Sequence, residues 1–110
     1  MKVKLENREY ELKANGAFMK KYQETFGENM IVALYKCIQE QDIYTVAKMT
    51  YCAIQEELPS FDEWIDSFET PLFIIQEMQN IIMFFTRSVK STVKPKEQPE
   101  EKDAKKKTMK

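Results

Sequence analysis

The stretch from Pro71 to Lys90, PLFIIQEMQNIIMFFTRSVK, constrains the fold of this chain more than any other part of its sequence. Thr70 can act as an N-cap, and Pro71 suits the first position of a helix. At about 100° per residue, one arc of about 120° collects seven large apolar side chains. They are Ile74, Ile75, Met78, Ile81, Ile82, Phe85 and Val89. The pattern predicts a helix over residues 71–90 whose arc faces the core of the domain.

Four further apolar residues of this stretch fall outside the arc: Leu72, Phe73, Met83 and Phe84. On the predicted helix, Phe73 and Phe84 point in one direction, and Leu72 and Met83 share another. A helix that is apolar on more than one side is either central to the fold or offers a face to a partner. Other elements of the domain could cover these side chains, or they could contact a partner or another copy of the chain. We name the four as candidate contacts for partner binding or self-association.

The N-terminal segment 2–13 alternates as β-strands do. Val3 and Leu5 point one way and Tyr10 and Leu12 match them across a turn near Asn7-Arg8. An isolated two-stranded hairpin is marginally stable in water. We therefore expect this hairpin to lie on the helices or to pair along an edge.

Four helices are predicted between the hairpin and residue 71. The first covers about 17–26 and ends at Gly27, the second follows a cap at Asn29, and the third follows a cap at Asp42 and ends near Glu57. The fourth begins at a capping box of Ser60 and Glu63. The chain is thus expected to be α+β and mainly α, with a hairpin and about five helices in one domain of residues 1–90.

Apolar residues at helical spacing mark one stripe on each predicted helix. They are Phe18, Met19, Tyr22 and Phe26 on the first; Ile31, Leu34, Tyr35 and Ile38 on the second; Ile43, Val46, Ala47, Thr50, Tyr51 and Ile54 on the third; and Phe61, Trp64, Ile65 and Phe68 on the fourth.

Residues 91–110 differ in composition from the rest of the chain. They include two prolines, seven lysines and four acidic residues, a net charge of +3, and almost nothing to bury. This composition predicts a disordered, charged tail. Ten basic and fourteen acidic residues remain for 1–90, a net charge of −4. An acidic body argues against a nucleic-acid-binding domain.

Residue types that carry catalytic or metal chemistry are scarce. The chain has no histidine, which is the commonest general base and metal ligand, and only two cysteines, Cys37 and Cys52. Both cysteines lie in apolar helical patterns and are expected to be buried, reduced thiols. The acidic pairs Glu56-Glu57 and Asp62-Glu63 are typical of helix ends. We therefore expect no enzyme activity, no cofactor and no metal site. Neither a secretory signal nor a membrane span is expected, which favours a cytoplasmic location.

The order of elements resembles the tail assembly chaperones of long-tailed phages that infect Gram-positive bacteria. Their K-x-Y-E-L-like strand is similar to Arg8–Leu12, their helix ending in E-T-G to Glu24–Gly27, and their S-F-E-E-x-x-D-like helix start to Ser60–Asp66. Here Phe26 precedes Gly27 where Thr-Gly is more usual.

The resemblance implies a non-enzymatic protein that binds the tape measure protein and keeps it soluble while tail tube subunits polymerise around it. It also implies a place in the host cytoplasm and not in the mature virion. The tail tube protein is a further candidate partner, and a homo-oligomer is a candidate state. The alternative is a small structural or adaptor protein of the phage tail or of a prophage region. Nucleic acid and membrane are not expected as partners.

Overall fold

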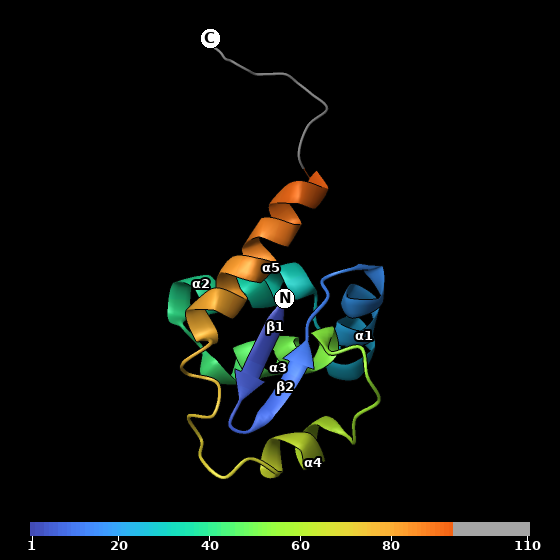
Figure 1. Cartoon of the computed structure of the whole chain (residues 1–110). Coiled ribbons are helices and arrows are strands. Elements are labelled where there is room, and N and C mark those ends of the chain that lie inside the picture. The colour runs from blue at the N-terminus through green and yellow to red at the C-terminus, as the bar shows by residue number, and fades with distance from the viewer. Residues whose placement is uncertain (94–110) are drawn as a thin grey trace.

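The computed structural model describes residues 1–93, so most of the predicted tail lies outside the described residues (Figure 1). The fold is mainly helical α+β, as predicted, with an N-terminal hairpin and five helices among these residues. Its elements are β1 (Lys2–Leu5), β2 (Arg8–Glu11), α1 (Gly16–Phe26), α2 (Met30–Glu40), α3 (Ile43–Ala53), α4 (Phe61–Asp66) and α5 (Met78–Val93).

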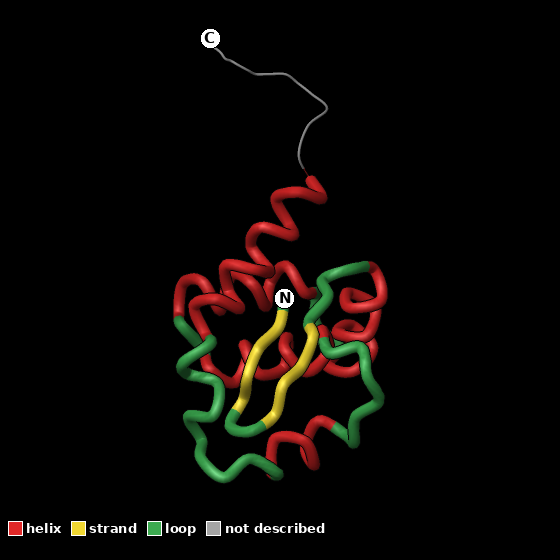
Figure 2. Tube along the Cα trace, viewed as in Figure 1, coloured by secondary structure: helices red, strands yellow, loops and turns green. Residues whose placement is uncertain are grey.

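The β1–β2 hairpin is antiparallel and pairs Val3 with Tyr10. Its turn lies one residue before the predicted position, at Glu6 and Asn7, and Glu6 has a left-handed φ of 59°. Val3 and Tyr10 belong to the face that is buried against the helices. The hairpin therefore lies on the helices, which was one of the two arrangements left open by the sequence (Figure 2).

Side-chain caps begin the helices where the sequence predicts them. Asn15, Asn29 and Asp42 each accept a hydrogen bond from a backbone N–H in the first turn of α1, α2 and α3. The predicted capping box opens α4, and Gly27 ends α1 in a left-handed conformation. Short polar side chains satisfy amide groups that have no partner within the helix, so these starts are determined locally.

The end of α3 does not follow the prediction. The helix ends at Ala53 and not near Glu57, because the chain turns there to meet the hairpin. Ile54 forms a β-bridge with Leu12, and the N–H of Lys13 donates to the Ala53 carbonyl at 3.0 Å. Both Leu12 and Ile54 are fully buried by this contact.

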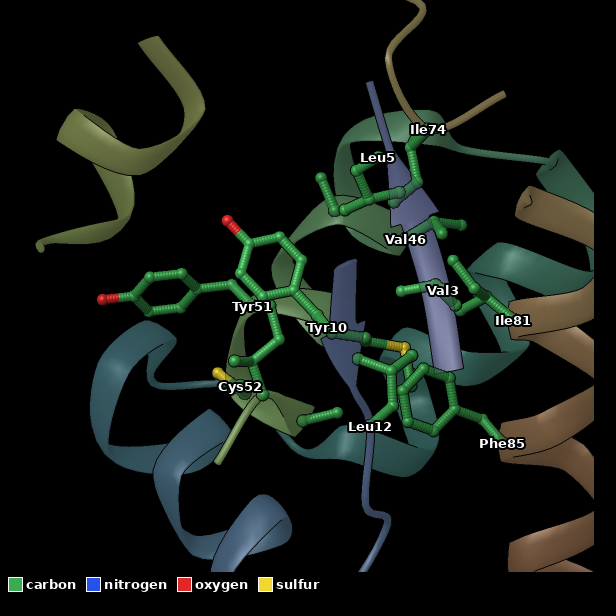
Figure 3. Packing of buried hydrophobic residues seen from close by; sticks show 14 of the residues in the cluster. Val3, Leu5, Tyr10, Leu12, Val46, Tyr51, Cys52, Ile74, Ile81 and Phe85 are labelled. Carbon is green, nitrogen blue, oxygen red and sulfur yellow. The ribbon is translucent and has the colours of Figure 1, made fainter. Parts of the chain in front are cut away.

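The central helix of the core is α3, which packs against α1, α2, α4 and α5. Eight of its eleven residues are buried. Figure 3 shows side chains from the hairpin, α3 and α5 meeting in one cluster, including Leu5, Leu12, Val46 and Ile81. The central position therefore belongs to α3, and not to the apolar stretch 71–90 that constrains the fold most in the sequence.

The predicted helix over 71–90 begins seven residues late, at Met78. Residues 71–77 form successive turns with bonds between residues three apart, such as the Glu77 N–H to the Ile74 carbonyl at 3.1 Å. Within this segment both Phe73 and Ile74 are buried. Packing of these two neighbours overrides the local helix start, since tertiary contacts commonly outweigh intrinsic propensity.

The hairpin turn fixes the chain just before these turns. The Glu6 carboxylate accepts hydrogen bonds from the backbone N–H groups of Glu69 at 3.0 Å and Thr70 at 3.1 Å. Arg8 donates to the hydroxyl and the carbonyl of Ser67, both at 2.8 Å. Contacts separated by some sixty residues in sequence therefore position this loop.

Most of the predicted arc is core, because Ile74, Met78, Ile81, Ile82 and Phe85 are all buried. Ile75 is exposed and Val89 is only partly buried. The error at Ile75 follows from the helix start, because its direction was calculated for a helix that has not yet begun.

Candidate docking surfaces

An apolar hollow lies between α1, the N-terminus of α2 and α5. Its volume is about 630 Å³. The apolar part of its lining consists of Ala14, Phe18, Met19, Met30, Ile31, Phe85 and Val89. This volume could accommodate several side chains of a binding partner, since ligand-binding pockets commonly have volumes of about 300–1,000 Å³.

Two stacked rings make the floor of the hollow. Phe18 of α1 and Phe85 of α5 lie with ring centroids 4.9 Å apart and planes at 13°. Lys20 and Glu24 are the charged residues that line it, and both are exposed on α1. The hollow thus combines a rigid aromatic floor with one charge of each sign. We call it the α1–α5 hollow.

A second apolar surface lies on α2. This helix buries Ala33, Leu34 and Cys37, so only Leu34 of the four apolar stripe residues marked in the sequence is buried. Ile31, Tyr35 and Ile38 from that stripe are exposed, as is Val32. We call these four exposed residues the α2 stripe. The helix has apolar residues on nearly every side, more than one packed face can bury. This excess of apolar residues is the sequence signal that could have predicted a binding surface on α2.

A small hollow lies between the α2 stripe and α5. It is lined by Ile31, Leu34, Tyr35 and Ile38 together with Thr86 and Val89, and its volume is about 220 Å³. The Thr86 hydroxyl already donates to the Ile82 carbonyl at 2.8 Å. No charged side chain lines this hollow, so its lining is mainly apolar.

Of the four candidate contact residues, Phe73 is core. Its ring stacks on Phe68 at 4.0 Å and meets Trp64 edge-on at 6.0 Å. Residues of the α4 region therefore cover Phe73, which was one of the alternatives. Leu72 is exposed beside it.

The other two candidates, Met83 and Phe84, differ in exposure on α5. Met83 is exposed, whereas Phe84 is half-buried with its ring 5.3 Å from that of Phe85. Because residues 71–77 are not helical, the pairs predicted to share a direction do not share one. The surface offered to a partner consequently lies mainly on α1 and α2, at Met19 and the α2 stripe.

Polar chemistry within the described residues serves the fold. Glu28 accepts a hydrogen bond from the Tyr22 hydroxyl at 3.1 Å and pairs with Lys36 at 3.5 Å and Lys48 at 3.9 Å. Burial, followed by the nearby Glu28 charge, raises the pKa of Tyr22. This group ties the α1–α2 turn to α3.

Neither cysteine is a reactive thiol in this fold. Both are buried and unpaired, and burial raises the pKa of Cys37 to about 12 and that of Cys52 to about 11. A protonated thiol is a poor nucleophile and metal ligand.

Residues 1–93 contain no group of three or more His, Cys, Asp or Glu side chains placed to hold a metal ion. Over the same range, none of the helices combines the length and apolar character needed to cross a membrane.

Comparison of the chain with protein-family models, with curated proteins and with solved structures found no match. The resemblance to phage tail assembly chaperones therefore stays a prediction, and the function has to be argued from the surfaces described above.

Proposed function

We propose that this chain is a non-enzymatic assembly chaperone of the phage-tail type, which binds the tape measure protein and keeps it soluble while the tail tube assembles. The observation that carries the proposal is the α1–α5 hollow. A small domain rarely leaves such a hydrophobic concavity open unless something binds there.

The chemistry of the hollow suits an apolar stripe on a helical client. A helix satisfies its own backbone hydrogen bonds, so it can bury side chains in an apolar groove without leaving unpaired backbone groups. Met19 and Met30 add flexible side chains, which let one surface accept varied apolar sequences. Such a site is expected to accept many apolar sequences, each with modest affinity. Several copies of the chain along one long client would then bind by avidity.

Co-expression with the tape measure protein of the same genome tests the proposal. The wild-type chain should increase the soluble fraction of that client, and Met19→Glu should remove most of the effect by placing a charge in the apolar hollow. We expect Met19→Glu to weaken binding at least roughly tenfold, because a buried unpaired charge is costly.

Ala17→Glu is the matched control. Ala17 is an exposed residue of α1 and does not line the hollow, so the same substitution should leave the chaperone effect intact. If the tape measure protein is equally soluble with and without the wild-type chain, the chaperone role fails. If Met19→Glu acts like wild type while the client is solubilised, the function stands but the site is misplaced.

A further inference from the structure

We propose that the α2 stripe pairs with the α2 stripe of a second copy of the chain, forming a two-fold symmetric dimer. This inference does not depend on the identity of any client. It assigns the α2 stripe to self-association, whereas Met19 and Phe18 line the α1–α5 hollow; Ile31 lies at the border of the two surfaces.

The exposed apolar area matches one interface of ordinary size. The four residues of the α2 stripe are each between 39% and 61% exposed. At about 200 Å² for a large side chain, they expose on the order of 400 Å² together. A stable interface buries about 800 Å² per partner, and roughly 60% of that area is apolar. The stripe therefore supplies most of the apolar part of one such interface.

The absence of charge at the centre of the stripe favours a second copy as the occupant. A two-fold contact brings each patch against itself, so a central charge would face an identical charge. Ile31, Tyr35 and Ile38 lie within about 60° of the α2 circumference, with no charged residue between them. The neighbouring hollow against α5 also lacks charge.

The other exposed apolar surfaces suit self-pairing less well. The hollow between α3, α4 and residues 70–73 carries Asp66 and Glu69 in its lining, and these would meet their own copies across a two-fold axis. The α1–α5 hollow carries Lys20 and Glu24, which can pair with charges of a different sequence. Figure 1 shows α2 beside α5 and away from α4, so pairing through α2 leaves the α4 end free.

The oligomeric state of the full chain in solution tests this inference. Sedimentation equilibrium of the wild type should give twice the chain mass of 13.1 kDa. Tyr35→Glu should raise the dimer dissociation constant at least roughly a hundredfold, because each dimer would then hold two facing carboxylates. Tyr44→Glu is the matched control: Tyr44 is similarly exposed but lies on α3, and this variant should dimerise as the wild type does.

Disulfide trapping then tests the two-fold geometry. Tyr35→Cys should give a covalent dimer under mild oxidation, and Tyr44→Cys should not, while the buried native thiols stay unreactive. A wild-type chain that stays monomeric at high concentration overturns the inference. So does a dimer that Tyr35→Glu leaves unchanged, or a larger open-ended assembly. Met19→Glu should keep the dimer, so loss of client binding and loss of dimerisation can be told apart.

Discussion

Phe73→Ala provides the sharpest test of how the segment before α5 is built. Phe73 is only 9% exposed, and the substitution removes its stacking on Phe68 and its edge contact with Trp64. Truncation of a buried Phe to Ala costs about 3–5 kcal/mol. We expect about 3 kcal/mol here, because Phe73 borders a surface hollow that water can fill. A small domain is stable by about 5–15 kcal/mol, so the variant should fold with much of that margin lost.

Urea unfolding followed by tryptophan fluorescence measures this loss directly. Trp64 is the only tryptophan of the chain and touches the altered site. Leu72→Ala is the control, because Leu72 is 55% exposed and its truncation should cost about 0.5 kcal/mol or less. On a continuous helix over 71–90, both residues would lie outside the core arc and cost similar amounts. Equal losses for the two variants would therefore refute the turn structure and the packing described for Phe73.

Two further perturbations test the long-range clamp and the buried thiols. Glu6→Ala should lower the free energy of unfolding by about 1–3 kcal/mol and speed amide exchange in the loop after α4, because two backbone N–H groups lose their acceptor. Asn7→Ala changes the same turn without removing that acceptor, so it should have neither effect. Equal effects of the two variants would show that the Glu6 hydrogen bonds do not hold this loop. Because burial raises the pKa of Cys37 to about 12 and of Cys52 to about 11 from the usual 9.0, their contribution to stability is complete below pH 9 and is lost as pH rises towards those values. The urea midpoint of unfolding should therefore decrease as the pH is raised above 9, and it should decrease less in the double Cys→Ala variant. A thiol reagent should label the chain only after unfolding, and rapid labelling of the folded chain would contradict the burial of the two thiols.

Local signals in the sequence were sufficient wherever short-range chemistry decides the structure. The predicted caps Asn29 and Asp42 and the capping box of Ser60 and Glu63 gave three helix starts correctly, since a side-chain oxygen near an unpaired N–H acts within a few residues. Alternation predicted the hairpin and its buried face, represented by Val3 and Tyr10. These features need no knowledge of the rest of the fold.

The candidate contact surface was predicted less well, because exposure depends on how many elements surround each helix. Phe73 had been named as a contact, but Trp64 of α4 and Phe68 cover it. The sequence placed Leu34, Tyr35 and Ile38 on one apolar stripe of α2. The helix packs through Ala33, Leu34 and Cys37, which leaves Tyr35 and Ile38 exposed. Periodicity identifies apolar faces without indicating which of two such faces will find a neighbour.

The sequence by itself determined the fold class, the helix starts of α1 to α4 and the lack of histidine chemistry. Tertiary structure decided that α3 is the central helix, that α5 begins at Met78 and that an apolar surface remains open on α1 and α2. The physical reason is the range of the interactions. Caps and turns act within one helical turn, whereas the Glu6 clamp, the Leu12–Ile54 bridge and the Phe18–Phe85 stack join residues far apart in sequence. Which apolar side chains stay exposed is known only after those distant contacts have formed.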